Sequence, residues 1–520
     1  MRATKMTKAI SKTRLPLAAM AVVALLLTAT AAFAAAPGIT GPNFNLTATA
    51  AYVSQPDGSA VYSWGYGCSG APSGFAPSAI SGAFCNTMQM PGPTLIVTEG
   101  QTVQVTLHNN LPGAAGNTSI LFPGFSLQPF TDGVPGLLTQ EAAPGGTVTY
   151  RFTAATPGTR AYYSGTQGDL QIEMGLYGAI IVLPSAVPAA CTSGVHASNL
   201  AAQSHWGESD FRLAAAAYDH PGTCYDREYL FQFSEIDPRI HRQAEEQSTR
   251  GCTGCMTVAT EPYVPAYYMV NGRSMPDLMD PNYAPEYPHQ PYNGNPHMHP
   301  GELTLLRIVG TGRWQHPFHE HGNHVRILGR DGNLILSATD PNSLAGPLLF
   351  TTTTTPGLAM DGIYYWSGKG LNWDPYGHNP ASGSTLPCTP DANGYNTGAP
   401  NAINYFEWCQ DHNKPLQAHP FGDVAGGGPV TLPDPNIFAN GPWYGGSPYL
   451  GPDATTRAVG STGTTPPSGT VANPPDSEAG FAFMWHSHNE REITTNNSFP
   501  GGMLMMMLVD SREFVIDESN

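Results

Sequence analysis

Basic side chains are scarce in this chain of 520 residues. It has 22 Lys and Arg against 39 Asp and Glu, and charged residues make up 12% of it. Five of the basic residues lie within positions 1–14, so the net charge falls from −17 for the whole chain to −22 without that segment. A balance this negative argues against nucleic acid and anionic membrane surfaces as partners.

Long apolar runs are also missing, with one exception near the N-terminus. The run at 15–33 follows the basic segment and is succeeded by the small residues "AFAAAPG". This order predicts a secretory signal peptide over residues 1–36, and the small-residue exit argues against the alternative of a membrane anchor. We therefore expect a secreted, periplasmic or cell-surface protein with no membrane span in the mature chain.

The cysteine count is even, and all eight cysteines follow the N-terminal segment. In an exported chain this pattern favours disulfides over free thiols. The "CTGC" segment at 252–255 could instead be a redox or zinc pair, but no second pair stands near it. Pairing of sequence neighbours is the simplest expectation: Cys68–Cys85, Cys191–Cys224, Cys252–Cys255 and Cys388–Cys409.

Apolar residues at helical spacing are almost absent, whereas strand patterns recur. Alternation is clearest in "TLIVTEGQTVQVTLHNN" at 94–110, where an acidic residue and glycine mark a turn. Shorter strand patterns follow at 176–184, 227–237, 301–310 and 501–510. The sequence therefore predicts an all-β protein built of sandwiches.

A weak internal repeat suggests two related domains. A strand with an acidic-glycine turn occurs at 94–107 and again at 301–309, and each half closes with aromatic residues, a polar motif and an apolar strand. We expect a first domain at 37–190 and a second at 191–520. The Gly-, Pro- and Asn-rich stretch near 370–478 is interpreted as long loop insertions.

Histidine is concentrated in two motifs, "HPFHEHGNH" at 316–324 and "HSH" at 486–488. Residues two apart on a strand point to the same side, so each H-x-H pair can face one site. Imidazole is the commonest ligand for copper and zinc, and two neighbouring pairs would offer four nitrogens. Solvated histidines are the alternative. A third pair, His297 and His299, could bind copper or nothing.

The two motifs resemble the third and fourth copper motifs of the multicopper oxidases, and the segments at 92–112 and 175–184 resemble the family's framework. The likeness covers most of 90–184, 227–330 and 480–510. It implies tandem cupredoxin-like Greek-key β-sandwich domains with copper as cofactor. By this resemblance His316 serves the blue type 1 copper, and the trinuclear cluster takes the other four histidines: His319, His321, His486 and His488.

The sequence departs from the family pattern at several ligand positions. Ser487 stands where the type 1 thiolate belongs, and Glu492 stands where a further histidine is expected, although Met503 matches the axial position. A blue site requires the soft thiolate, so none is expected. Four first-domain ligands are replaced as well, by Leu121, Pro123, Tyr163 and Gly165.

Residues near the replaced first-domain motif offer two interpretations. Tyr163 either fills the volume of the lost imidazole and copper or joins a substitute site. The same segment carries other polar or phenolic groups that could supply a ligand or a redox tyrosine: Tyr162, Asp169, Gln171 and Glu173.

The main functional expectation is an exported copper-binding oxidoreductase. It would oxidise a small-molecule or metal-ion reductant, such as a phenol, with copper at His316, His319, His321, His486 and His488. Glu320, Glu490 and Glu492 are candidates to orient these imidazoles or move protons. The alternatives are a non-enzymatic copper-binding or surface-assembly protein, and a relative of copper nitrite reductases. The resemblance also implies a homotrimer.

Overall fold

The computed structural model describes residues 36–80, 85, 88–128, 132–369, 387–402, 404–410, 480–510, 512 and 514–518. Residues from Ala32 onward form one compact unit. The predicted signal peptide and most of the predicted insertion near 370–478 lie outside the described residues. Among the described residues, no helix is long and apolar enough to cross a membrane.

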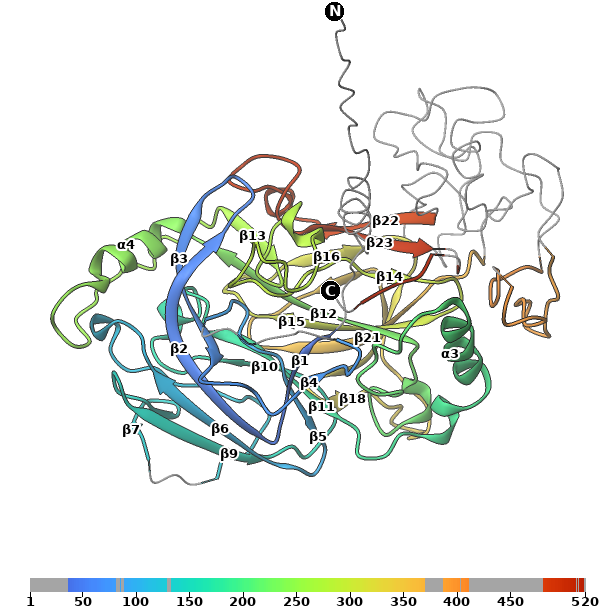
Figure 1. Ribbon diagram of the computed structural model, residues 1–520, viewed down its shortest axis with the longest axis horizontal. Helices are drawn as coiled ribbons and strands as arrows, with labels where there is room; N and C mark the ends of the chain where they lie inside the picture. Colours follow the sequence, from blue (N-terminus) through green and yellow to red (C-terminus); the bar gives the residue numbers. More distant parts are fainter. Residues whose placement is uncertain are drawn as a thin grey trace, which may run out of the picture. The chain divides into compact units, whose positions relative to one another are not determined.

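The first part of the chain forms two sheets (Figure 1). The strands of the larger sheet lie in the order β10 (Gly158–Tyr163), β11 (Tyr177–Leu183), β5 (Leu95–Thr98), β1 (Gly38–Thr40) and β4 (Phe75–Ala76). The smaller sheet has the order β3 (Ala60–Cys68), β2 (Asn43–Ser54), β6 (Thr102–Asn109) and β9 (Thr147–Thr153). A short hairpin adds β7 (Val134–Pro135) and β8 (Gln140–Glu141).

The alternation seen in the sequence explains how these sheets pack. In β6, Val103, Val105 and Leu107 are fully buried, while the residues between them are partly exposed. Side chains from the facing sheet, including Leu95 and Ile180, belong to the same apolar cluster. The first part is therefore a β-sandwich whose core lies between its two sheets.

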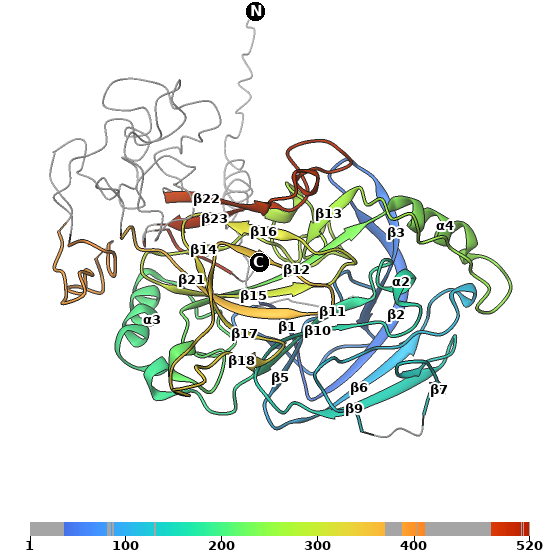
Figure 2. The same ribbon diagram turned by 180° about the vertical axis from the view of Figure 1, so that it is seen from behind.

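A second sandwich follows. Its larger sheet runs β13 (Tyr267–Val270), β12 (Arg227–Ile236), β15 (Leu303–Gly310), β21 (Ala359–Tyr365), β17 (Val325–Arg330) and β18 (Asn333–Leu334), with β19 (Leu348–Leu349) also on β17. The other sheet runs β14 (His297–Met298), β23 (Leu504–Asp510), β22 (Gly480–Ser487), β16 (Pro317–Glu320) and β20 (Thr351–Thr353). Figure 2 shows β14, β23, β22 and β16 from behind.

The core of the second sandwich is rich in aromatic residues and methionine. Phe231 and Phe233 of one sheet meet Phe318 and Trp485 of the other, and the ring centroids of Phe233 and Phe318 lie 4.8 Å apart. Met503, Met505 and Met507 are fully buried in the same cluster. Methionine suits such irregular gaps between rings because its side chain is unbranched and polarizable.

Helices are few in the described part. They are α2 (Gly168–Gln171), α3 (Gly194–Trp206) and α4 (Pro238–Ser248), with short 3-10 turns elsewhere. Asp237 caps α4 by accepting from the backbone N–H of Arg239, and Pro238 supplies a favourable first residue. The predicted all-β class, built of sandwiches, is confirmed. The domain limits 37–190 and 191–520 stay a prediction.

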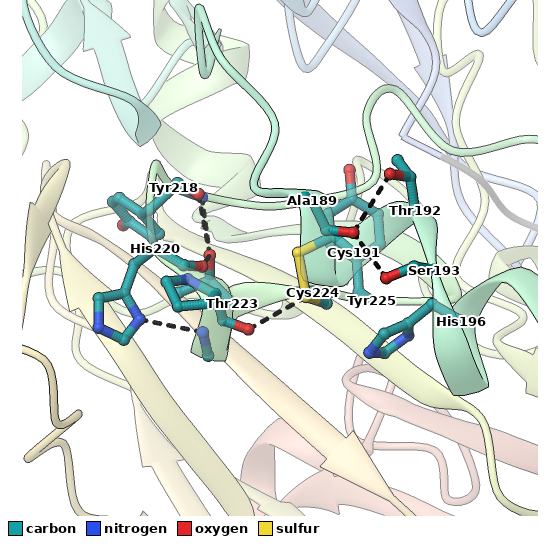
Figure 3. The surroundings of a disulfide bond; sticks show 12 residues. Ala189, Cys191, Thr192, Ser193, His196, Tyr218, His220, Thr223, Cys224 and Tyr225 are labelled. Atoms are coloured by element: carbon teal, nitrogen blue, oxygen red, sulfur yellow. Dashed lines mark hydrogen bonds between the residues drawn. A yellow bond between two sulfur atoms is a disulfide. The ribbon is translucent and has the colours of Figure 1, made fainter.

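All four predicted disulfides are present: Cys68–Cys85, Cys191–Cys224, Cys252–Cys255 and Cys388–Cys409. The bridge between Cys191 and Cys224 closes the segment that contains α3 (Figure 3). On either side of it, Ser193 Oγ donates to the Ala189 carbonyl at 2.8 Å, and Thr223 Oγ1 donates to the His220 carbonyl at 2.7 Å.

Candidate metal centre

The two H-x-H motifs lie on adjacent antiparallel strands. In the pairing of β16 with β22, His319 stands directly opposite His486, with Phe318 opposite Ser487 on one side and Glu320 opposite Trp485 on the other. Because side chains alternate along each strand, Phe318 and Trp485 point into the core while His319 and His486 point away from it. The core aromatics therefore fix which face carries the imidazoles.

The four imidazoles of these motifs form one group. Ring centroids are 4.9 Å apart for His319 and His321, 4.6 Å for His319 and His488, and 5.8 Å for His319 and His486. His486 lies 5.2 Å from His321 and 4.9 Å from His488. His319 and His486 are buried, His321 is half-buried and His488 is exposed, so the group opens to solvent on one side.

Neighbouring polar groups orient two of the rings. His319 Nδ1 lies 3.0 Å from the hydroxyl oxygen of Thr351 on β20, and His486 Nδ1 lies 2.9 Å from the carbonyl oxygen of Ser487. His486 Nε2 is thereby directed at His321 Nε2, 3.2 Å away. A metal–nitrogen bond of about 2.0 Å places two tetrahedral ligands about 3.3 Å apart, so this spacing suits two ligands of one ion.

Burial and crowding keep these rings neutral. Desolvation and the neighbouring imidazoles lower the pKa of His319 to about 4 and that of His321 to about 3. The pKa of His486 is also lowered, mainly by desolvation. Neutral imidazole is the form that binds a metal, so the donors do not need to lose a proton at neutral pH.

The donor atoms do not yet converge on a single point. Across the described residues, no group of three or more His, Cys, Asp or Glu side chains is arranged so that it could hold a metal ion as it stands. The strand pair nevertheless places the ring centroids of His321 and His488 each within 5.2 Å of both His319 and His486. Rotation about the Cβ–Cγ bond can turn an imidazole nitrogen toward a shared metal without moving the backbone. Imidazole nitrogen is a ligand that suits copper.

His316 lies in a different setting from the other four predicted ligands. Its Nε2 is 3.0 Å from Glu235 Oε2 and its Nδ1 is 2.9 Å from Glu492 Oε2, and all three side chains are buried. Burial alone would lower the pKa of His316, but hydrogen bonds to both carboxylates outweigh it and raise the pKa to about 9. The ring is therefore an imidazolium between two carboxylates, with both nitrogens occupied.

The remaining residues at the expected type 1 position surround the same array. Ser487 Oγ donates to Glu492 Oε2 at 2.5 Å, and Asn489 Nδ2 donates to Glu492 Oε1 at 2.8 Å. The backbone N–H of Met503 donates to the Glu492 carbonyl at 2.8 Å. The four positions that the family resemblance assigned to type 1 copper thus come together, but hydrogen bonds and ion pairs connect them.

Other residues singled out from the sequence have separate partners. His297 Nδ1 is 2.6 Å from Asp510 Oδ2, and His299 Nε2 is 2.6 Å from Glu208 Oε1. Both imidazoles are buried, and each lies against a carboxylate. Glu320 is buried beside the Thr352 hydroxyl, and burial raises its pKa to about 8.

The first-domain positions are packed or hydrogen-bonded. Tyr163 and Leu121 exchange backbone hydrogen bonds, and the Tyr163 ring packs against two apolar clusters. Tyr162 OH donates to the Pro93 carbonyl, and Gln171 Oε1 accepts from Thr118 and Ser164. This packing favours the interpretation that Tyr163 fills the lost ligand volume.

Sequence analysis did not find Glu235, Thr351 or Tyr263. Glu235 follows an apolar strand pattern and reads there as a strand-end charge, and Thr351 begins a run of five threonines. Neither Glu235 nor Thr351 belongs to a motif of its own. Each is related to the site only by its short distance to a histidine in the folded chain.

Comparison with known proteins points to one family. Residues 80–187 match the family model described as multicopper oxidase. The chain is 39% identical over 117 residues to multicopper oxidase MCE of Talaromyces pinophilus and 38% identical over 117 residues to laccase 1 of Metarhizium acridum. The matched part of the chain is similar to multicopper oxidases. Copper is the cofactor that this likeness implies.

The match to these two multicopper oxidases is local. It covers 22% of this chain and 18% of each relative, so the chain spans less than a fifth of the length of the curated relatives it matches. Among solved structures, the blue copper oxidase of Nitrosomonas europaea aligns over 89% of this chain and 85% of its own, with 15% identity and a TM-score of 0.44. The likeness to multicopper oxidases rests on the sequence matches.

Proposed function

We propose that this protein is an exported oxidoreductase related to the multicopper oxidases, with a histidine-ligated copper site of fewer ligands and no blue type 1 centre. The observation that carries the proposal is the pairing of β16 with β22, which gathers His319, His321, His486 and His488. Its reductant would be a small molecule, such as a phenol, or a metal ion. Bound copper would supply one-electron oxidation.

The chain's own residues would hold and orient that site. Thr351 and the Ser487 carbonyl fix the rings of His319 and His486 from behind, as outer partners of metal-bound histidines usually do. His488 lies at the exposed side of the group, where a reductant can approach. His316 would support the site from the neighbouring ion-pair array rather than ligate the metal.

Absence of a type 1 centre follows from the chemistry at Ser487. A hydroxyl oxygen is a poor substitute for the soft thiolate that blue copper requires. Here that hydroxyl is also engaged with Glu492, which replaces a second ligand. Ordinary laccase-type transfer of four electrons to oxygen is therefore not part of the proposal.

A non-enzymatic copper-binding protein is the second candidate. The observation that favours it is the ion-pair array at the type 1 position, because that array interrupts the usual route by which electrons enter. Both candidates require copper at the same four histidines, and they differ in turnover. Assembly into a homotrimer also stays a prediction.

The test uses the full mature chain recovered from its export compartment. We expect about one copper per chain, with nitrogen ligation in the electron paramagnetic resonance (EPR) spectrum and no intense thiolate-to-copper band. Replacing His319→Ala together with His488→Ala should remove the copper. The matched control is His220→Ala, a half-buried histidine that contacts Asn342 and Gly222 instead.

Turnover then separates the two candidates. Oxidation of phenolic or metal-ion reductants by the copper-loaded chain, lost in the double variant and kept in His220→Ala, supports the enzyme. Stoichiometric copper without turnover supports the binding protein. Undiminished copper in the double variant contradicts the site.

A further inference from the structure

The ion-pair array at the type 1 position continues into a longer chain of contacts. From Glu492 it passes through His316 to Glu235, at 2.9 and 3.0 Å. Glu235 Oε1 lies 3.1 Å from the Tyr263 hydroxyl, and that hydroxyl donates to Glu173 Oε2 at 2.6 Å. The array therefore ends at a tyrosine of the second sandwich and a carboxylate of the first.

Tyr263 has an unusual setting because two buried carboxylates approach its hydroxyl. A phenol carries one proton, so it can donate to only one of them at a time. Glu235 Oε1 already accepts from the backbone N–H groups of Arg313 and Trp314, at 2.6 and 2.9 Å. The shorter contact identifies Glu173 as the proton acceptor, and burial raises the pKa of Glu173, which makes it a better base.

The Tyr263 ring also touches a second oxidisable aromatic ring. Its centroid lies 5.5 Å from that of Trp314, at a perpendicular angle, and the Arg313 guanidinium stands 4.1 Å above it. Trp314 and Tyr263 are both half-buried, so this pair connects the buried array with the surface. The cation disfavours a positive charge on the ring, so loss of the electron requires loss of the proton as well.

We propose that Tyr263 is a redox-active tyrosine that passes electrons toward the copper site in place of the missing type 1 centre. In this step the Tyr263 O–H bond would break, its proton would pass to the Glu173 carboxylate, and one electron would pass to copper(II) held by the four histidines. A neutral tyrosyl radical, a carboxylic acid and copper(I) would result. The external reductant then returns one electron, and the proton on Glu173 returns to the phenolate oxygen. This step rests on the proposed function, which supplies copper(II) as the oxidant.

The chain offers a matched control for this tyrosine. Tyr267 donates to a single carboxylate, Asp57 Oδ2, at 3.0 Å. Within the described part of the chain, its hydroxyl does not bond to the ion-pair array and its ring does not pair with a tryptophan, unlike those of Tyr263. Loss of its hydroxyl removes a tyrosine–carboxylate pair of the same chemistry without touching the proposed route.

The decisive experiment needs no copper. The copper-free full chain is oxidised by photogenerated tris(bipyridyl)ruthenium(III), frozen, and examined by EPR for a tyrosyl radical. We expect Tyr263→Phe to lose at least half of the early tyrosyl signal and Tyr267→Phe to lose little of it. Glu173→Gln keeps the phenol but removes the acceptor, so it should slow radical formation severalfold. Circular dichroism confirms that each variant is folded.

Copper loading provides the second arm. Reduction of bound copper(II) by the external reductant should slow at least fivefold in Tyr263→Phe at unchanged copper content. An unchanged radical signal in Tyr263→Phe, or equal losses in both phenylalanine variants, overturns the tyrosine proposal whatever the copper result. Failure to bind copper would instead overturn the proposed function and leave the copper-free arm intact.

Discussion

The disulfide between Cys191 and Cys224 should contribute far more to stability than the one between Cys252 and Cys255. The first closes 33 residues and the second closes 3. With the chain-entropy relation, loops of these lengths correspond to about 3.7 and about 1.6 kcal/mol at 25 °C. Replacing both cysteines of each bridge by alanine should therefore lower the free energy of unfolding by amounts that differ by about 2 kcal/mol.

Local hydrogen bonds beside the Cys191–Cys224 bridge allow the effect of the bridge on the unfolded chain to be measured by itself. The turns at Ala189 and His220, which flank the first bridge, have their own hydrogen bonds and do not depend on the disulfide to stay closed (Figure 3). The folded state should therefore keep its contacts in the Cys191→Ala, Cys224→Ala variant. The loss of stability then comes mainly from the larger freedom of the unfolded chain.

Urea unfolding followed by tryptophan fluorescence measures the effect. The unchanged protein, the Cys191→Ala, Cys224→Ala variant and the Cys252→Ala, Cys255→Ala variant are compared, with circular dichroism to check the folded baseline. Equal losses in the two double variants, or a larger loss from the three-residue bridge, would refute the loop-length argument. Such a result would mean that native packing around the sulfurs decides the outcome.

Three further outcomes are expected. Ser487→Cys combined with Glu492→His should create an intense thiolate-to-copper absorption that neither single variant shows; copper-loaded protein without that band contradicts the assignment of the type 1 position. Thr351→Val removes the partner of His319 and should weaken copper binding about 10- to 100-fold, measured by competition with a chelator. Burial raises the pKa of Glu518 to about 8, so the folded chain holds a proton there that the unfolded chain releases near its ordinary pKa. Stability should consequently fall as pH rises from about 4.5 to about 8, by up to about 1.4 kcal/mol per pH unit, and Glu518→Gln should flatten that slope in urea titrations at several pH values.

Local pattern was enough to predict the strands, the sandwiches and the two H-x-H pairs. Alternation along one strand places His319 and His321 on one side, and the apolar neighbours Phe318 and Trp485 show which side is the core. An even cysteine count predicted disulfides, and the simplest of the many possible pairings, between sequence neighbours, is the one present.

Long-range contacts were not predictable in the same way. Glu235 and His316 are 81 residues apart, and Tyr263 and Glu173 are 90 residues apart. No periodicity within one strand encodes which carboxylate an imidazole will meet across two sheets. The contacts of His316 with two carboxylates therefore became visible only in the folded chain.

The Glu235–His316–Glu492 array also has a consequence for how the protein matures. In a type 1 site a metal ion links the strands that carry its ligands, so a chain that depends on this link lacks it until the metal binds. In this chain an imidazolium and two carboxylates join the end of β12, the start of β16 and the turn after β22 from within. Folding can thus finish before any metal binds, and the chain can exist as a closed apoprotein that is loaded afterwards.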